Sequence, residues 1–375
     1  MCKHSSPNVI SWAFRMFKGL YAGRRILITG HNGFKGSWLS YWLQELGADI
    51  YGLSLPISTR PNHFELLIPN MPGAHIDLAD FQTVQDLMCS FQPELVFHLA
   101  AQSLVRRSYR EPLLTLQSNV MGSANLLQAA RACPALKGLV IVSSDKCYQN
   151  QEWPWGYREN EALGGHDPYS TSKACTELLV NCWRDSFFNP GTMQKPPLLA
   201  SARAGNVIGG GDWAEDRIVP SLIGSAIGNE SVNLRSPKAL RPWQHVLEAL
   251  SAYLLLGQKM LEGDGTVAQA WNFGPDDNQP ISVLKMAESL QKHWPKINFT
   301  CQPEPDAPHE AHILRLDSSK ARLLLQWHPV WDAEQTFARC ANWYRHYYEK
   351  GELSTADDLQ EYCRQAKQKG LAWTL

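Results

Sequence analysis

A tyrosine and a lysine stand four positions apart, at Tyr169 and Lys173, in a segment after Asp167-Pro168 that we expect to be helical. An α-helix has about 3.6 residues per turn, so this spacing places both side chains on one face. A free tyrosine has a pKa of about 10, and a neighbouring ammonium group favours its phenolate. The pair could therefore accept a proton from a hydroxyl group, although the same spacing taken alone is typical of a solvated helix face.

Three glycines, Gly30, Gly33 and Gly36, lie between an apolar segment and a segment with an apolar stripe at helical spacing. Glycines at a strand-to-helix turn let the backbone turn tightly and approach a pyrophosphate. The N-terminus of the following helix offers free N–H groups to phosphate oxygens. The pattern predicts a dinucleotide site, against the alternative of turn glycines in an ordinary loop. A nicotinamide cation bound there would further favour the phenolate of Tyr169.

The end of the second predicted strand, residues 50–55, indicates whether NAD or NADP is expected. NAD sites commonly place Asp or Glu about 20 residues after the loop, on the ribose 2′-hydroxyl. Ser54 occupies that place here, and a serine can also bind a hydroxyl group. Arg60 could instead receive the 2′-phosphate of NADP, or be a surface arginine. We expect NAD.

Strands and helices alternate through the first half of the chain and must position these residues. Buried strands are predicted at residues 24–30, 50–55, 95–99 and 139–144, and helices at 37–46, 81–89 and 119–132. This alternation predicts an α/β fold with a doubly wound, Rossmann-type parallel sheet. We expect an N-terminal extension at 1–22 and a NAD-binding domain at 23–204, to which some later segments return. Residues 205–375 are expected to form mainly a smaller, mixed α/β substrate domain.

The composition limits the partners. Of 375 residues, 44% are hydrophobic and 19% are charged, which is enough for a large core. The formal net charge of −1 gives no basic field for nucleic acid or an anionic membrane, yet allows a local cationic pocket. No run approaches the roughly 20 apolar residues of a membrane span. Nine scattered cysteines without a C-x-x-C pair predict a reducing cytoplasm.

Together these motifs resemble the extended short-chain dehydrogenase/reductase superfamily. The matching segments are residues 29–36, 99–101 and 143–144, with Tyr169 and Lys173. In that family, the residue at Ser144 orients the substrate hydroxyl, the tyrosine takes its proton and the lysine holds the nicotinamide ribose. The implied cofactor site is Gly30, Asn32, Gly33, Phe34, Gly36, Ser54, Asp77, Leu78, Ala100, Ala101, Tyr169 and Lys173. Asp77 would meet the adenine or be a turn carboxylate, and Asn119 would lie behind the tyrosine.

Two ionisable residues directly after Ser144, namely Asp145 and Lys146, narrow the resemblance. Sugar-nucleotide 4,6-dehydratases place an acid and a base there, whereas a simple epimerase has little to protonate. Longer segments are similar to the CDP-glucose 4,6-dehydratase family, at residues 30–38, 153–160, 164–169, 203–213 and 241–246. The resemblance runs from about Phe17 to the C-terminal region.

That resemblance implies conversion of CDP-glucose to CDP-4-dehydro-6-deoxyglucose and water, with NAD bound throughout. Tyr169 would take the proton of the C4 hydroxyl while hydride leaves C4, and Asp145 would protonate the departing C6 hydroxyl before hydride returns to C6. Lys146 stands where dTDP-glucose enzymes have the glutamate that removes the C5 proton. We favour Lys146 as that base, with a pKa depressed by burial and by Lys173, over a role in stabilising the enolate.

A substrate diphosphate requires cations, and guanidinium groups match phosphate oxygens. The candidates are Arg203, Arg217, Arg235 and Arg241. The resemblance favours Arg241, while Arg235 is expected at the surface. The predicted substrate site is Gln102, Asn206, Arg217, Arg241 and His309. The stretch at 309–312 lacks metal-site spacing, so no metal is expected. The aromatic loop at 153–157 would either wall the sugar or pack on the core.

Other functions share part of this pattern. A sugar-nucleotide epimerase would share Tyr169, Lys173 and the glycine loop, and a dehydratase could act on another nucleotide sugar. A non-catalytic protein is disfavoured by the intact Ser144. The resemblance also implies a homodimer, paired through the helices that carry Asn119 and Tyr169, and a role in deoxysugar biosynthesis for lipopolysaccharide O-antigen.

Overall fold

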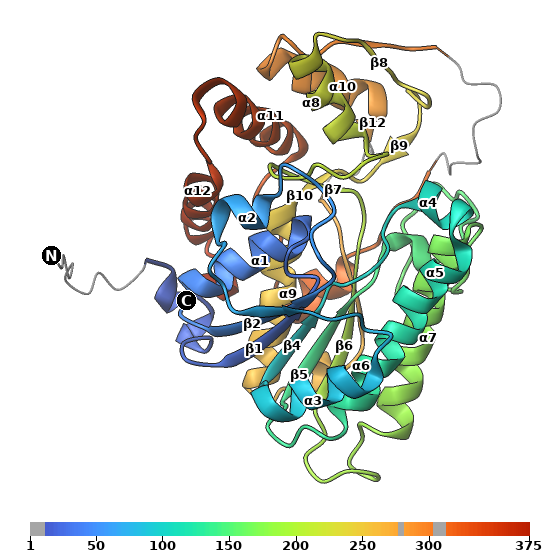
Figure 1. Ribbon diagram of the computed structural model, residues 1–375, viewed down its shortest axis with the longest axis vertical. Helices are drawn as coiled ribbons and strands as arrows, with labels where there is room; N and C mark the ends of the chain where they lie inside the picture. Colours follow the sequence, from blue (N-terminus) through green and yellow to red (C-terminus); the bar gives the residue numbers. More distant parts are fainter. Residues whose placement is uncertain (1–11, 277–280, 303–312) are drawn as a thin grey trace, which may run out of the picture.

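A parallel sheet of seven strands lies at the centre of the larger part of the molecule (Figure 1). The computed structural model describes residues 12–276, 281–302 and 313–375. In chain order the strands of this sheet are β1 (Arg25–Thr29), β2 (Asp49–Ser54), β3 (Gly73–His75), β4 (Leu95–His98), β5 (Gly138–Val142), β6 (Leu198–Ala204) and β11 (Ala270–Phe273). The spatial order is β11-β6-β5-β4-β1-β2-β3, so the direction of winding changes between β1 and β4. The expected doubly wound α/β fold is confirmed, and ligands of such sheets bind beyond the strand ends at that point.

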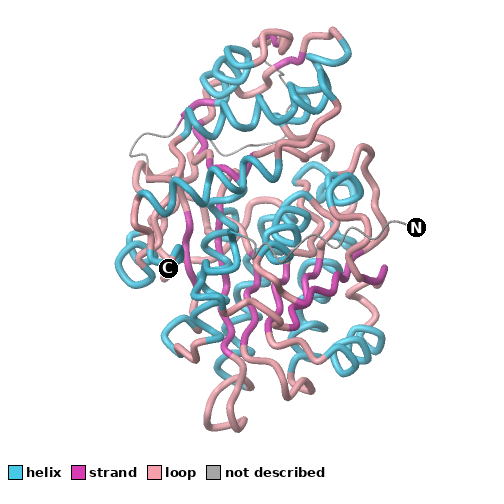
Figure 2. Tube along the Cα trace, turned by 90° about the vertical axis from the view of Figure 1, so that its left-hand side faces the viewer, coloured by secondary structure: helices cyan, strands magenta, loops and turns pink. Residues whose placement is uncertain are grey.

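Helices cover both faces of the sheet (Figure 2). Successive side chains on a strand point to opposite faces. Ile26 and Ile28 accordingly pack in the core on the side of α1 and α9, and Leu27 packs in the core on the side of α3, α6 and α7. These helices are α1 (Phe34–Glu45), α3 (Phe81–Phe91), α6 (Gly122–Ala130), α7 (Pro168–Ser186) and α9 (Val246–Leu261). The helix predicted at 119–132 begins with a π-helical turn, η2 (Gln117–Met121), before α6.

A smaller part of the molecule, with helices and short strands, lies beyond the carboxyl ends of the sheet (Figure 1). Its helices are α8 (Ile218–Gly228), α10 (Val283–His293), α11 (Ala333–Lys350) and α12 (Thr355–Gln368). Its strands pair as β7 (Val207–Ile208) with β10 (Gln244–His245), β8 (Val232–Asn233) with β13 (Phe299–Thr300), and β9 (Leu240–Arg241) with β12 (Ile281–Ser282). β11 and α9 come after residue 205 and belong to the sheet and its covering layer, while the domain boundaries themselves remain a prediction.

Short helices complete the chain. They are η1 (Trp12–Gly19), α2 (His63–Leu67), α4 (Val105–Arg110), α5 (Pro112–Leu116), η3 (Asp145–Cys147), η4 (Gly265–Val267), η5 (Ala321–Leu325) and η6 (Ala372–Thr374). Phe17 of η1 stacks on Trp373 of η6 with ring centroids 5.3 Å apart, so residues from both ends of the chain share the core. Within the described ranges, no helix combines the length and apolar character needed to cross a bilayer.

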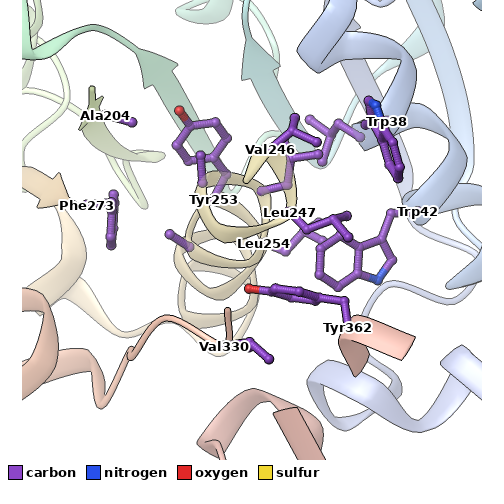
Figure 3. Packing of buried hydrophobic residues seen from close by; sticks show 14 of the residues in the cluster. Trp38, Trp42, Ala204, Val246, Leu247, Tyr253, Leu254, Phe273, Val330 and Tyr362 are labelled. Atoms are coloured by element: carbon purple, nitrogen blue, oxygen red, sulfur yellow. The ribbon is translucent and has the colours of Figure 1, made fainter. Parts of the chain in front are cut away.

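Helix α9 is apolar on nearly every side, as a helix enclosed by other elements must be (Figure 3). Trp42 of α1 and Tyr362 of α12 pack against it. Its one buried carboxylate, Glu248, accepts backbone N–H groups from Val330 at 2.9 Å and Trp331 at 2.8 Å, and the hydroxyl of Tyr362 at 2.7 Å. These bonds fasten the C-terminal segments to the layer that covers the sheet.

A buried ion pair joins β6 to the helix that carries the tyrosine and lysine. A guanidinium nitrogen of Arg203 lies 2.7 Å from Glu177 of α7, and the two side chains are 2% and 0% exposed. Arg203 also donates to the hydroxyl of Tyr148 at 2.6 Å and to the carbonyl of Glu159 at 3.1 Å. Arg203 is therefore part of the core. The interpretation of Arg203 as a ligand of the substrate diphosphate was wrong, because its charge is already paired with Glu177 and enclosed.

We expect Arg203→Met to lower the free energy of unfolding by about 3–5 kcal/mol, because Glu177 would keep a buried charge without its partner. Urea unfolding followed by tryptophan fluorescence measures this loss. Adding Glu177→Gln removes that uncompensated charge, so the double variant should be more stable than Arg203→Met alone. The control is Arg345→Met, at a pair whose arginine is 50% exposed, with an expected loss under about 1 kcal/mol. Equal losses at the two arginines would contradict the prediction.

Candidate active site

A cavity of about 1510 Å³ extends along the carboxyl ends of the parallel strands. One side of it is formed by the glycine loop and the ends of β2, β4 and β5, and the other side by residues of the smaller part. The predicted catalytic residues and the predicted cofactor residues all line it. Of the predicted substrate residues, Gln102, Asn206, Arg217 and Arg241 line it as well, and His309 lies outside the described residues.

The glycine loop is shaped for a phosphate group. Gly30 has a φ of 73°, and a Cβ there would lie 2.7 Å from the backbone nitrogen of Ala100 at the end of β4. A Cβ on Gly36 would overlap the carbonyl oxygen of Gly30. Gly33 is the N-cap of α1 and, as a glycine, has no side chain that could cap the helix. The first N–H groups of α1 can therefore reach a ligand in the cavity. These features fit the pyrophosphate of a dinucleotide.

The end of β2 offers a hydroxyl group for a ribose. The side chain of Ser54 is buried, and its oxygen has no hydrogen-bond partner among the described residues. Asp77 accepts the N–H of Ala79 at 2.9 Å, so it is a turn carboxylate that also lines the cavity. Arg60 is 84% exposed at its side chain and lies 3.8 Å from Glu65. A free, buried serine hydroxyl and a solvated arginine fit NAD better than NADP.

Local sequence explains where the tyrosine and lysine lie. Asp167 is the N-cap of α7 and accepts the N–H of Ser170 at 2.9 Å, and Pro168 occupies the first helical position, as is typical of helix starts. Tyr169 and Lys173 are 8% and 6% exposed. The ammonium group of Lys173 donates to the carbonyl of Val142 at 3.2 Å, which ties the helix to the end of β5.

Burial raises the pKa of Tyr169 to about 12, and the neighbouring carboxylate of Asp145 adds to this. The hydrogen bond with Ser144 and the charge of Arg217 act in the opposite direction. Burial also lowers the pKa of Lys173 to about 8. Among the protein's own groups, burial outweighs those that lower the pKa of Tyr169, and the expectation that Lys173 and a nicotinamide cation together favour the phenolate stays a prediction.

Ser144, Asp145 and Lys146 form a compact turn after β5. The hydroxyl of Ser144 donates to a carboxylate oxygen of Asp145 at 2.9 Å and accepts the N–H of Lys146 at 3.2 Å. Asp145 is 4% exposed, and burial raises its pKa against the opposing charges of Lys146 and Arg241. A raised pKa suits a carboxyl group that must donate a proton. Lys146 is half-buried and lines the cavity.

The predicted substrate residues differ in the hydrogen bonds that they already make within the protein. Arg217 donates to Asp212 at 2.9 Å and to the hydroxyl of Ser103 at 2.8 Å, while Arg241 donates to the carbonyl of Leu240 at 3.0 Å. Both arginines still line the cavity. The side-chain amide of Gln102 bonds within its own region, to Leu104 and Thr115, and so holds the loop after β4.

Two further segments carried alternative interpretations in the sequence, namely the aromatic loop at 153–157 and the stretch at 309–312. Trp153 stacks on Tyr157 with centroids 5.5 Å apart, and Tyr157 stacks on Tyr148 at 5.1 Å, so the aromatic loop packs on the protein. The stretch at 309–312 lies outside the described residues. Within the ranges that are described, no three His, Cys, Asp or Glu side chains gather as a metal site would require.

Lys35 is a residue of this cavity to which the sequence analysis gave no role. It lies in the first turn of α1 and lines the cavity. Burial lowers its pKa to about 7, Arg217 and Lys173 add to this, and Asp145 opposes it. The signal available in the sequence was a lysine between Phe34 and Gly36, inside a loop that otherwise approaches a ligand through its backbone.

Residues 27–340 match the family described as GDP-mannose 4,6 dehydratase. A curated CDP-glucose 4,6-dehydratase of Salmonella typhimurium is 45% identical over 331 residues, which cover 88% of this chain and 92% of the relative. A dTDP-glucose 4,6-dehydratase of Xanthomonas campestris pv. campestris is 26% identical, with 85% and 92% covered. Two solved structures share the fold. UDP-glucose 4-epimerase of Thermotoga maritima with UDP-glucose has a TM-score of 0.75 and 22% identity, and the match covers 86% of this chain and 99% of that chain. dTDP-glucose 4,6-dehydratase of Bacillus anthracis with NAD has a TM-score of 0.71 and 20% identity, with 87% of this chain and 98% of that chain covered.

Proposed function

The chain belongs to the GDP-mannose 4,6 dehydratase family, and from this premise we propose that it converts CDP-glucose to CDP-4-dehydro-6-deoxyglucose and water with bound NAD. The observation that carries the proposal is the placement of Asp145 and Lys146 beside Ser144 and Tyr169 in one cavity. An epimerase needs no acid for a leaving hydroxyl group. The 45% identity to a CDP-glucose 4,6-dehydratase over most of both chains supports CDP-glucose as the substrate.

The first step is oxidation at C4 of the glucose. Bound NAD would supply the hydride chemistry, with acceptance from C4 and return to C6. Tyr169 accepts the proton of the C4 hydroxyl, and Ser144, which lines the same cavity, orients that hydroxyl. The charge of Arg217 favours the phenolate against the effect of burial. The free hydroxyl of Ser54 binds the ribose, and the N-terminus of α1 binds the pyrophosphate.

The second step is loss of water across C5 and C6. The C4 ketone acidifies the hydrogen on C5, and Lys146 accepts that proton. Asp145 gives its proton to the C6 hydroxyl as the C6–O bond breaks, and water leaves. Hydride addition at C6 and proton return at C5 complete the product, so the sugar loses one water with no net oxidation. Arg217 and Arg241 hold the diphosphate, and Asn206 contacts the sugar or the phosphate.

The reaction is tested with NAD and a panel of CDP-, dTDP-, UDP- and GDP-activated sugars. We expect CDP-glucose to give a product lighter by one water, with the alkali-induced absorbance of a 4-keto sugar. Tyr169→Phe should lower the rate by at least about 100-fold, because the proton of the C4 hydroxyl has no acceptor. Turnover of another nucleotide sugar in place of CDP-glucose, or a product of unchanged mass, would refute the proposed activity.

The role of Lys146 is tested with Lys146→Met. We expect this variant still to oxidise C4, seen as NADH absorbance, while exchange of the C5 hydrogen for solvent deuterium falls at least about 100-fold. Asp145→Asn is the matched comparison, because it keeps the C5 base and should retain exchange while losing water elimination. If Lys146→Met exchanges the C5 hydrogen at the wild-type rate, another group must be the base that removes it.

We also propose a homodimer formed through α5, η2 and α7, which pack side by side within the chain (Figure 1). Large apolar side chains are exposed on these elements, with Leu113 at 79%, Met121 at 54% and Leu178 at 56% exposure. A second copy that covers this face would remove them from water. The same helices carry Asn119 and Tyr169, so the contact would also brace the catalytic helix.

Light scattering after size exclusion measures the assembly. We expect the wild type to have the mass of two chains and Leu178→Glu to shift toward one chain, because a buried carboxylate without a partner disfavours the contact. The matched control is Leu323→Glu, 78% exposed on η5, which should leave the mass unchanged. A dimer that Leu178→Glu leaves intact, or that Leu323→Glu disrupts, would refute this interface.

We infer a cytoplasmic location and a place in deoxysugar biosynthesis. The eight cysteines that the structure describes are free thiols, which suits a reducing compartment. The product is a 6-deoxy sugar activated by a nucleotide, and lipopolysaccharide O-antigen is the destination that we propose for it.

A further inference from the structure

Asp212 is a buried carboxylate of the cavity to which the proposed reaction gives no role. It follows the glycines at 209–211, after β7, and is 6% exposed. One of its carboxylate oxygens accepts the N–H of Ala214 at 3.1 Å, and the other accepts an N–H of the Arg217 guanidinium group at 2.9 Å. Both oxygens therefore hold groups of the short segment that leads into α8.

A tyrosine of α11 fixes the backbone of Asp212. The hydroxyl group of Tyr344 donates to the carbonyl of Asp212 at 2.6 Å and accepts the N–H of the same residue at 2.9 Å. Tyr344 is fully buried, and its ring packs edge-on against Trp213 and Trp343, with centroids 6.0 and 5.2 Å away. Asp212 is thus anchored to the core of the smaller part of the molecule.

The guanidinium group of Arg217 is held from two sides of the cavity. One terminal nitrogen bonds to Asp212 of the smaller part, and the other donates to the hydroxyl of Ser103, in the loop after β4, at 2.8 Å. The side chain of Arg217 is 32% exposed and that of Asp212 is 8% exposed, so the cation is more accessible than its partner. A planar guanidinium group that is bonded at both terminal nitrogens keeps one orientation.

We propose that Asp212 is a positioning residue, which holds the guanidinium group of Arg217 in place for the diphosphate of the nucleotide sugar. This rests on the proposed function, in which Arg217 binds that diphosphate. An unrestrained arginine loses rotamer freedom when it binds an anion, and the loss weakens binding by about two- to tenfold. Asp212 prevents this loss by ordering the side chain beforehand.

The carboxylate of Asp212 also acts directly on the ligand, in the opposite direction. A negative charge beside a phosphate site repels the anion. If repulsion were the larger effect, removal of the charge would strengthen diphosphate binding. If the orientation of Arg217 is the larger effect, the same substitution weakens binding. The sign of the change in affinity therefore tests the proposal.

Calorimetric binding of CDP to the whole protein, with NAD added, measures this affinity without turnover. We expect Asp212→Asn to raise the Kd of CDP by about tenfold. Asparagine has a single acceptor oxygen for the two N–H groups that Asp212 accepts, so its amide N–H faces either Arg217 or Ala214. The number of sites per chain, from the same titration, separates a loss of affinity from a loss of folded protein.

A double-mutant cycle shows whether Asp212 acts through Arg217. In the background of Arg217→Met, Asp212→Asn should change the Kd of CDP by less than about twofold, whereas independent effects would multiply. The matched control is Asp358→Asn on α12, away from the cavity. Asp358 is 5% exposed at its side chain and pairs with Arg339 at 3.2 Å, and its substitution should leave the Kd unchanged.

An unchanged or lower Kd in Asp212→Asn would overturn the proposal, and so would an equal effect of this substitution with and without Arg217. If Asp212→Asn does not fold, Tyr344→Phe decides. It frees the backbone of Asp212 and should raise the Kd by about threefold, only while Arg217 is present. If dTDP, UDP or GDP binds in place of CDP, the proposed substrate is wrong, and the same cycle with that nucleotide still decides the role of Asp212.

Discussion

Between Gly36 and Gly30 there is no room for a side chain, and Gly30 itself packs against the backbone of Ala100. This contact brings the first turn of α1 to the point where the winding of the sheet changes direction, between β1 and β4. The free N–H groups of α1 and the side chain of Lys35 depend on that placement, and the hydroxyl of Ser54, at the end of β2, lines the same cavity. The catalytic turn after β5 then lies at the same edge, because the strands are parallel.

Charge at the site is local and is controlled by burial. The chain carries a formal net charge of only −1, yet Lys35, Lys173, Arg217 and Arg241 line one cavity. Burial favours the neutral form of a titratable group, which raises the pKa of Asp145 and lowers that of Lys173, whereas the charge of Asp212 raises the pKa of Arg217. The site thus holds a carboxyl group suited to donate a proton and amines close to neutrality, side by side.

Much of the site could be predicted from the sequence. The glycine loop, the turn at 144–146 and the pair at Tyr169 and Lys173 are short motifs, and the structure brings all of them to one cavity. Arg203 was misjudged because its partner Glu177 comes from another element. No role could be predicted for Lys35, because the groups that surround it in the cavity come from other elements of the fold.

By itself, the sequence determined the alternation of strands and helices in the first half of the chain, the doubly wound sheet and the spacing of the catalytic residues, because these follow from hydrophobic periodicity and local backbone chemistry. Only the tertiary structure decided which arginines face the cavity, that burial raises the pKa of Tyr169 to about 12 and that Lys35 lines the same cavity. Those properties arise from burial and from charges acting through space. They join residues from α1, η3, α7, α8 and α9, which are far apart in the chain and meet only when it folds.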